Sequence, residues 1–314
     1  MARCKLLLID TIHPSFEALL GDGYEITDGT KWSRLETISR IGEFNGILIR
    51  SRFRIDSEIL TKAASLSFIA RAGAGMENID TAYAASKGIA CIHAAEGNRD
   101  AVGEHALAML LALFNNLVSA DGEVKRGVWK REENRGVELQ GKTIGVIGYG
   151  NMGTAFVKKL SGFDVTVLIY DKYRDFSDGT YFRKAGMDKI YSQSDVISLH
   201  IPLTDETNYL VNDAFINRFR KNFYLVNTSR GMNVNTSDLV KNMKLGKIAG
   251  AALDVLEYEA FSFEAIAADS LPEPFMYLAS SPQVVLSPHI AGWTHESNLK
   301  IAKILAEKIK AIGI

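Results

Sequence analysis

Short apolar runs alternate with segments of helical periodicity along most of the chain, and this alternation restricts the possible folds more than any other feature. Uninterrupted apolar runs of about four to eight residues indicate strands that are buried on both faces of a sheet. Short, mainly apolar segments that we interpret as such strands occur at 5–10, 46–51, 67–73, 89–94, 143–150, 165–171, 195–202, 223–229, 250–255 and 283–289. Because helical patterns lie between them, we predict an α/β protein with parallel sheets covered by helices on both faces.

One long apolar segment separates the first group of strands from the second. Residues 100–120 are apolar around much of the circumference of a helix, so we predict a continuous helix there that is buried on more than one side. This division predicts two doubly wound domains. The first comprises 1–98 with 290–314, because the closing helical pattern can return to the first sheet, and the second comprises 99–289.

The composition of the 314-residue chain is that of a globular protein, with 47% hydrophobic and 23% charged residues. A net charge of −1 argues against a broad basic surface for nucleic acids or anionic membranes. No apolar run approaches membrane-spanning length, and the first one is too short for a signal peptide. Cys4 and Cys91 lack metal-ligand spacing, which favours reduced, buried thiols. We expect a soluble cytoplasmic protein that holds no metal and binds neither nucleic acid nor membrane.

A glycine-rich loop follows the predicted strand at 143–150. Its sequence, "GVIGYGNMG", has the G-x-G-x-x-G spacing, in which Gly148 permits a tight turn, Gly150 lets a pyrophosphate approach the backbone, and Gly153 lets the next helix pack closely. The N-terminus of that helix offers N–H groups to phosphates. Asp171 ends the following strand, where its carboxylate would bind the adenosine ribose and repel a 2′-phosphate. The loop predicts an NAD site, with Lys172 weakening the preference over NADP; the alternative is a purely structural turn.

Seven short stretches, in their order and spacing, resemble the D-isomer-specific 2-hydroxyacid dehydrogenase family along essentially the whole chain. They are "RAGAGMENID" (71–80), "GNRDAVGEHAL" (97–107), "LQGKTIGVIGYGNMG" (139–153), "LHIPLTDETNYLV" (199–211), "VNTSRG" (226–231), "GAALDVLEYE" (250–259) and "SPHIAG" (287–292). The resemblance implies an NAD-binding Rossmann domain at 99–289, inserted in a flavodoxin-like substrate-binding domain.

The resemblance also implies a catalytic set of Arg230, Glu259 and His289. All three lie at or beyond the ends of predicted strands, at the sheet edge where ligands of α/β proteins bind. Arg230 would bind the substrate carboxylate and the C2 oxygen with its planar donors, and His289 would exchange the hydroxyl proton while hydride passes to NAD. Glu259 would hold the imidazole ring. Glu257 competes for that role, and the family spacing selects Glu259.

Further cofactor contacts are implied by the same resemblance. They are expected from Gly148, Tyr149, Gly150, Asn151, Met152, Gly153, Asp171, His200, Pro202, Thr228 and Asp254. Asp254 is expected near the nicotinamide end, whereas His200 is interpreted mainly as a residue that holds loops together and His105 as a packing residue of its helix. Ala260 departs from the family pattern, where proline is common, and the segment 261–281 has no assigned role.

The substrate is predicted from clustered cations in the first domain. Arg50 and Arg52 would share one face if their strand extends that far, and arginine suits a phosphate group. The alternative is a solvated surface cluster. The loop "RAGAGMEN" offers backbone N–H groups to a carboxylate, and the asparagines at 78 and 98 either position the substrate or form turns. The expected substrate contacts are Arg50, Ser51, Arg52, Ala74, Gly75 and Asn98.

Within the family, D-3-phosphoglycerate dehydrogenases look most similar, which implies oxidation of D-3-phosphoglycerate to 3-phosphohydroxypyruvate in serine biosynthesis. The chain ends soon after its closing helix, so we expect no serine feedback through an appended regulatory domain. The alternatives are a glyoxylate, hydroxypyruvate or D-lactate-type reductase, and a non-enzymatic NAD-sensing protein similar to transcriptional corepressors. The long apolar helix and Trp129 indicate a homodimer.

Overall fold

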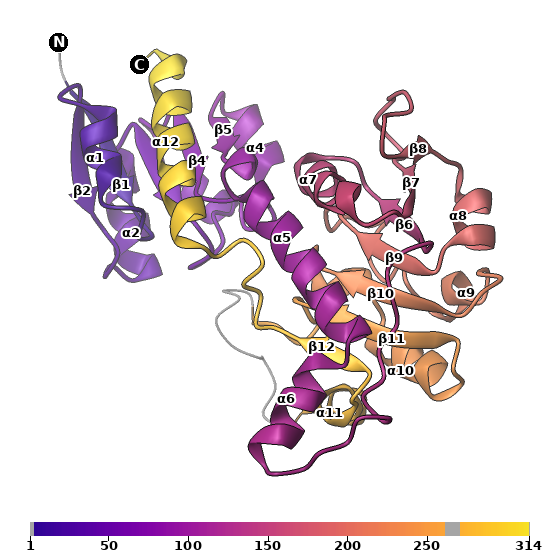
Figure 1. The fold of residues 1–314 in the computed structure, drawn as a ribbon. Coiled ribbons are helices and arrows are strands. Elements are labelled where there is room, and N and C mark those ends of the chain that lie inside the picture. The colour runs from indigo at the N-terminus through magenta and orange to yellow at the C-terminus, as the bar shows by residue number, and fades with distance from the viewer. Residues whose placement is uncertain (1–2, 261–270, 314) are drawn as a thin grey trace. The chain divides into compact units, whose positions relative to one another are not determined.

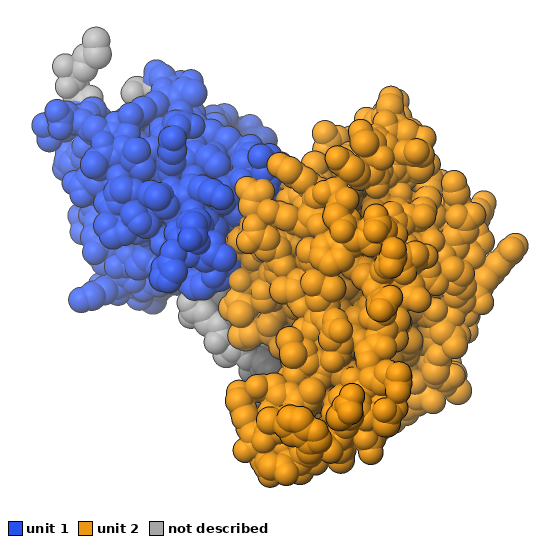
Figure 2. All heavy atoms as spheres, in the orientation of Figure 1, with its two compact units in different colours: residues 1–99, 260–265, 293–314 blue, residues 100–259, 266–292 orange. Residues whose placement is uncertain are grey.

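The computed structural model describes residues 3–260 and 271–313. The chain folds into two compact units, shown in different colours in Figure 2. The first unit comprises residues 1–99, 260–265 and 293–314, and the second comprises residues 100–259 and 266–292. Each unit is built on one parallel sheet.

The first unit contains a five-stranded sheet with the order β2-β1-β3-β4-β5. Its strands are β1 (Cys4–Leu8), β2 (Tyr24–Asp28), β3 (Gly46–Ile49), β4 (Phe68–Arg71) and β5 (Ala90–His93). The inner strands β3 and β4 are buried at every position, as expected where helices cover both faces of a sheet. This strand order is that of the flavodoxin-like fold.

Helices of the first unit pack on both sides of this sheet. They are α1 (Ser15–Leu20), α2 (Arg34–Arg40), the 3₁₀ turn η1 (Ile41–Glu43), α3 (Ser57–Lys62), α4 (Thr81–Ser86) and α12 (His295–Ile312). Asp56 and Asp80 begin α3 and α4 by accepting hydrogen bonds from backbone N–H groups of the first turn. The C-terminal helix α12 packs against α1 (Figure 1), and Phe16, Leu305 and Ile309 belong to the buried cluster between them.

The second unit contains a seven-stranded sheet with the order β12-β11-β10-β9-β6-β7-β8. Its strands are β6 (Thr143–Ile147), β7 (Thr166–Tyr170), β8 (Arg183–Lys184), β9 (Val196–Leu199), β10 (Phe223–Asn227), β11 (Ile248–Leu253) and β12 (Val284–Leu286). The chain leaves β6 for β7 on one side and returns to β9 on the other, so the direction of strand addition reverses between β6 and β9. That reversal is the switch point of a Rossmann sheet. The predicted fold class, two doubly wound units of Rossmann and flavodoxin-like type, is confirmed.

Two helical layers cover the sheet of the second unit. Its helical segments are α5 (Ala95–Phe114, from residue 100 onward), α6 (Leu117–Lys125), α7 (Asn151–Lys159), η2 (Leu160–Gly162), α8 (Met187–Gln193), α9 (Asp213–Ile216), η3 (Gly231–Asn233), α10 (Thr236–Lys244) and α11 (Glu273–Ser280). Met109 and Leu110 of α5 join Phe156 of α7 in one buried cluster. Phe215 of α9 and Leu239 of α10 belong to a separate cluster. The sheet is therefore apolar on both faces, which explains its uninterrupted apolar strands.

The continuous helix predicted over 100–120 is wrong. The structure has α5 and α6 in its place, bent by 63° at a break that contains Asn116, whose φ is +49°. Asparagine tolerates this left-handed conformation better than most residues, so the chain can turn there. Among the described helices none alone is long and apolar enough to cross a membrane, although the bent pair passes that test by length and composition.

Candidate active site

The predicted site residues of the second unit lie at the carboxyl edge of its sheet. The glycine loop follows β6, His200 follows β9, and Arg230 comes shortly after β10. Asp254 follows β11, and His289 lies in the loop after β12. Because these five strands are parallel neighbours, residues far apart in the chain meet along one edge, beginning at the switch point.

The glycine loop is tightly packed at its first and third glycines and open at its second, Gly150. Gly148 has φ +96°, and a Cβ there would lie 2.3 Å from the carbonyl oxygen of His200. A Cβ on Gly153 would lie 2.1 Å from the carbonyl oxygen of Gly148, so this position also requires glycine. At Gly150 a Cβ would meet nothing within 4 Å, and no side chain caps the helix that begins at Asn151. The loop and the N-terminus of α7 therefore fit a pyrophosphate.

Asp171 is held at the end of β7 by backbone donors. Its carboxylate accepts hydrogen bonds from the N–H groups of Tyr149 at 2.7 Å and of Tyr173 and Arg174 at 2.9 Å. Burial opposes ionisation, but these bonds and the Arg174 charge hold the pKa of Asp171 below its usual value. Lys172, expected to weaken the preference for NAD, pairs with Glu206 at 2.5 Å. The fixed negative charge is suited to a ribose hydroxyl and unsuited to a 2′-phosphate.

Two buried polar atoms at the same edge lack protein partners. His200 bonds Ser198 Oγ through Nε2 at 2.8 Å, but its buried Nδ1 has no hydrogen-bond partner in the described structure, and neither has the hydroxyl of Thr228. Burial lowers the pKa of His200 to about 3, so the ring is neutral. These residues follow the adjacent strands β9 and β10. Unsatisfied buried polar atoms are rare in folded proteins, and these two are open to a hydrogen bond from a bound group or a water molecule.

The structure brings Glu259 and His289 into direct contact. Glu259 Oε2 lies 2.6 Å from Nδ1 of His289, although the two residues are 30 positions apart in the chain. Glu259 Oε1 also accepts the backbone N–H of Leu256 at 2.5 Å, which fixes the carboxylate. The competing Glu257 points elsewhere, because its carboxylate accepts hydrogen bonds from the hydroxyl of Tyr209 and the N–H of Thr236.

Arg230 is placed by a network of small polar residues that sequence reasoning does not reveal. Asn227 accepts the N–H and the hydroxyl of Ser229, and it donates from its amide to the carbonyl oxygen of Arg230 at 2.9 Å. Gly231 then packs against the segment that leads to Glu259, since a Cβ there would lie 2.0 Å from the carbonyl carbon and oxygen of Leu256. The turns that carry Arg230 and Glu259 are therefore in backbone contact.

Asp254 supports the loop that carries His289. Its carboxylate accepts hydrogen bonds from the Ser287 hydroxyl at 2.6 Å and from the N–H groups of Ile290 and Ala291 at 2.9 Å. Burial raises its pKa, but these bonds, together with the nearby ring of His105, leave the pKa of Asp254 below its usual value. The predicted contact of this residue with the cofactor stays a prediction, since the carboxylate is 1% exposed and serves the loop.

In the first unit, the expected placement of Arg50 and Arg52 on one strand face is wrong. β3 ends at Ile49, and the N–H groups of residues 50–52 turn toward Asp10 Oδ2, at 2.6 to 3.3 Å. Arg52 donates to the carbonyl oxygens of Ile9 and Gly29, so it serves the fold. The Arg50 guanidinium stacks over the ring of Trp293, 4.3 Å from its centroid.

The remaining predicted substrate residues also lie in the first unit. Ala74 and Gly75 are partly exposed in the loop after β4, and Asn78 in that loop donates to the carbonyl oxygen of Arg50 at 3.0 Å. The side-chain oxygen of Asn98 is buried without a hydrogen-bond partner in the described structure. Of the segment without an assigned role, residues 261–270 lie outside the described residues, and α11 occupies most of the rest.

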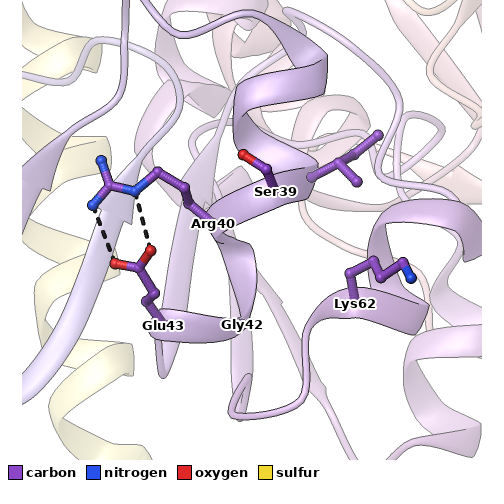
Figure 3. Close-up of a pocket in the computed structure, with 6 residues that line it drawn as sticks. Ser39, Arg40, Gly42, Glu43 and Lys62 are labelled. Atoms are coloured by element: carbon purple, nitrogen blue, oxygen red, sulfur yellow. Dashed lines mark hydrogen bonds and ion pairs between the residues drawn. The ribbon is translucent and has the colours of Figure 1, made fainter.

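A surface hollow of the first unit lies away from these residues. Figure 3 shows it between α2, η1 and α3, where Arg40 forms two hydrogen bonds of 3.1 Å with Glu43. Its lining, which includes Ser39, Gly42 and Lys62, contains none of the predicted site residues. Within the described ranges no cluster of histidine, cysteine or acidic side chains could hold a metal ion.

Comparison with known proteins identifies the family. The family model for the D-isomer specific 2-hydroxyacid dehydrogenase, NAD binding domain, matches residues 107–291 of this chain. The chain belongs to this family. The matched range contains the glycine loop, Arg230, Glu259 and His289, and it lies mostly in the second unit. The second unit is therefore the family's NAD-binding domain.

Members of the family with different names are similar to this chain. A D-3-phosphoglycerate dehydrogenase from Archaeoglobus fulgidus is 34% identical over 308 residues, which cover 97% of this chain and 56% of that protein. A glyoxylate reductase from Thermofilum pendens is 37% identical over 323 residues, which cover 99% of this chain and 92% of that protein. The structure of a D-lactate dehydrogenase from Aquifex aeolicus, complexed with NAD and lactic acid, matches with a TM-score of 0.83 at 28% identity, covering 98% and 95%. The chain thus spans about half the length of the first relative.

Proposed function

We propose that this protein is an NAD-dependent D-2-hydroxyacid dehydrogenase. The observation that carries the proposal is the 2.6 Å contact between Nδ1 of His289 and the Glu259 carboxylate, in the same unit as a glycine loop that fits a dinucleotide. An imidazole held by a carboxylate is a suitable general acid and base near neutral pH. Membership of the family supports the same activity.

His289 transfers the proton in this mechanism. The ionised Glu259 accepts the hydrogen on Nδ1, which fixes the tautomer and assigns proton exchange with the substrate to Nε2. During oxidation His289 takes the proton of the C2 hydroxyl group, and during reduction the imidazolium returns it to the C2 oxygen. Glu259 stabilises the imidazolium form through its charge. NAD, when bound, accepts the hydride from C2.

Arg230 binds the substrate in this proposal. Its guanidinium pairs with the carboxylate and the C2 oxygen, because a planar fork of donors matches both oxygens. The Asn227 network and the contact of Gly231 with Leu256 keep the Arg230 turn beside the Glu259 turn. Gly150 and the N-terminus of α7 would hold the pyrophosphate of NAD, and Asp171 would hold its ribose.

The other predicted cofactor residues are proposed to surround the same ligand. Tyr149, Asn151 and Met152 belong to the loop and the first turn of α7, while Pro202 is exposed in the segment after β9. The unsatisfied Nδ1 of His200 and hydroxyl of Thr228 would find partners in the cofactor. Satisfying two buried polar atoms would add to the affinity of the site.

The substrate is proposed to be D-3-phosphoglycerate, with Arg50 as the residue that binds its phosphate. In the described structure the Arg50 guanidinium forms no hydrogen bond or ion pair. Burial lowers the pKa of Arg50, and the negative charge of Asp10 partly opposes this shift. A desolvated guanidinium stacked on Trp293 and without an acceptor is suited to an anionic group. The similarity to a D-3-phosphoglycerate dehydrogenase supports this acid. The similarity to a glyoxylate reductase favours glyoxylate as the second candidate.

Oxidation of NADH with a panel of 2-oxo acids tests the function. We expect an NADH absorbance decrease with 3-phosphohydroxypyruvate, hydroxypyruvate or glyoxylate, and the highest kcat/KM for the phosphorylated acid. A higher kcat/KM for glyoxylate would select the second candidate. If NADH bound, as seen by its fluorescence, but no 2-oxo acid was reduced, the protein would be an NAD-binding protein without this activity.

Replacing Arg50 with alanine is expected to raise KM for 3-phosphohydroxypyruvate by roughly 10-fold or more, the loss expected for one charged hydrogen-bonded pair. KM for hydroxypyruvate should stay within about twofold, because that acid lacks the phosphate. Steady-state rates with both acids measure the difference. Arg54→Ala, an exposed arginine of the same segment, is the matched control. An equal rise for both acids would contradict the phosphate assignment.

We propose further that two copies associate through α6 and the segment after it. Leu117, Val118 and Val124 of α6 are each more than half exposed, and Trp129 is 75% exposed. Several large exposed apolar side chains within one short region are typical of a protein interface. We expect the protein to elute as a dimer in gel filtration with light scattering, and Leu117→Asp with Trp129→Ala to convert it to monomers. If the protein without these substitutions elutes as a monomer, the proposed assembly is wrong.

We also propose a cytoplasmic location. Cys4 and Cys91 are both free thiols, and Cys4 is buried. Free thiols are usual in a reducing compartment.

A further inference from the structure

A histidine of α5 joins the polar contacts around Asp254. Nε2 of His105 lies 2.9 Å from the hydroxyl oxygen of Ser287 and 3.5 Å from Oδ1 of Asp254. The Ser287 hydroxyl lies 2.6 Å from the same Asp254 oxygen. All three side chains belong to the second unit, and the interpretation of His105 as a simple packing residue does not account for this arrangement.

His105, Ser287 and Asp254 form a chain of hydrogen bonds whose donors and acceptors can be assigned. The Asp254 carboxylate, whose pKa is lowered, only accepts hydrogen bonds, so the single hydrogen of the Ser287 hydroxyl group points to it. The Ser287 oxygen then accepts from His105, which requires the ring to carry a hydrogen on Nε2. The direction runs from His105 to Ser287 to Asp254.

The hydrogen of the Ser287 hydroxyl group has two possible acceptors. Besides Asp254, the Ser287 hydroxyl has the sulfur of Met109 as a possible acceptor at 3.5 Å. The carboxylate is much nearer, at 2.6 Å, and His105 as a donor offers this hydrogen no further acceptor, so the hydrogen is directed at Asp254. Chains of hydrogen bonds strengthen one another in this way inside proteins.

Asp254, the last member of this series of hydrogen bonds, holds the backbone of His289 and of the two residues after it. Asp254 accepts the N–H groups of Ile290 and Ala291 through its carboxylate and the N–H of His289, at 2.7 Å, through its backbone oxygen. His289 has φ +54°, a left-handed conformation that is strained for a residue with a side chain. Such a conformation persists only when neighbouring bonds fix it. Loosening Asp254 or Ser287 would therefore let the imidazole move.

We infer that His105 is a positioning residue for His289, acting through Ser287 and Asp254 to hold the imidazole in the orientation that proton transfer requires. The inference rests on the proposed function. His105 itself touches neither substrate nor cofactor in this account. Its loss lowers kcat, because small displacements of a reacting group reduce the rate strongly, but leaves NADH affinity unchanged.

A set of variants in the full chain tests the inference. We expect His105→Phe, which keeps a ring but loses the donor, to lower kcat about 10-fold, with KM and the Kd of NADH within twofold of the unchanged protein. His105→Gln, which can donate to Ser287, should recover most of kcat. Glu104→Gln, an exposed substitution on the same helix, is the matched control. Unchanged kcat in His105→Phe would overturn the inference.

A second variant separates positioning from general damage to the fold. Ser287→Ala should lower kcat to a similar extent, and the double variant His105→Phe with Ser287→Ala should be no slower than the slower single variant, since both break one chain. Multiplying losses would overturn the inference. If His105→Phe does not fold, Ser287→Ala and His105→Gln carry the test. Nitrogen NMR of the unchanged protein should show the hydrogen of His105 on Nε2, and a ring protonated on Nδ1 alone would also overturn it.

The outcomes distinguish this inference from the proposed function. If the unchanged protein reduces no 2-oxo acid, the proposed function fails. If it reduces one and the His105 variants do so equally well, the function stands and the inference alone is wrong.

Discussion

Replacement of His289 with alanine is expected to lower kcat by roughly 10²–10⁴-fold, the range of general acid–base catalysis. Alanine cannot exchange a proton with the C2 oxygen, and it leaves the Glu259 carboxylate without its imidazole partner. The glycine loop and Asp171 remain, so NADH binding should be retained. Steady-state kinetics with the best 2-oxo acid and NADH fluorescence titration measure the two effects separately.

His295→Ala is the matched control for this variant. His295 is exposed at the start of α12 and has no assigned role, so kcat should stay unchanged. Turnover of His289→Ala at the rate of the unchanged protein would remove His289 from the mechanism. Loss of NADH binding together with turnover would show instead that the substitution disturbs the whole sheet edge.

Replacement of Gly231 with alanine is expected to lower kcat by about 100-fold and the free energy of unfolding by roughly 1–3 kcal/mol. The added Cβ would lie 2.0 Å from the carbonyl group of Leu256 and 2.5 Å from the backbone nitrogen of Glu257. Backbone atoms cannot give way as the end of a flexible side chain can. One of the turns that carry Arg230 and Glu259 must therefore move. Kinetics and thermal unfolding measure the two losses.

Gly162→Ala is the corresponding control in the same unit. A Cβ at Gly162 would meet nothing within 4 Å, so this variant should keep its activity and its unfolding temperature. If Gly231→Ala behaved like Gly162→Ala, the close contact between the two turns would not constrain the site. If it lost stability but kept kcat, the contact would serve the fold alone.

Short motifs allowed much of the fold and of the candidate site to be predicted from the sequence. Apolar strands and the glycine loop are local patterns, because a buried parallel strand and a tight strand–helix turn each restrict a few consecutive residues. The sequence placed Glu259 and His289 in one site through the resemblance, and the structure puts them in contact. Their catalytic roles stay predictions until kinetics are measured.

Features that depend on distant residues could not be predicted in the same way. Every residue of the edge strands β2 and β8 is partly or fully exposed, so these strands lack the continuous apolar run of an inner strand. The end of β3 at Ile49 follows from Asp10, some 40 positions earlier, which takes up the next N–H groups. The roles of His105, Asn227 and Gly231 arise from contacts between loops, and single residues of these types carry no distinctive signal in the sequence.

The division of the chain into units has a consequence for how the protein could diversify. Arg230, Glu259, His289 and the glycine loop all lie in the second unit, whereas Arg50 and Trp293 lie in the first. If Arg50 binds the substrate as proposed, substitutions in the first unit change which acid is accepted while the residues proposed for the redox and proton-transfer steps stay intact. Because the residues proposed to select the acid and those proposed to carry out the reaction lie in different units, each set can change independently. Such independence would explain how one fold gives rise to reductases and dehydrogenases with different names.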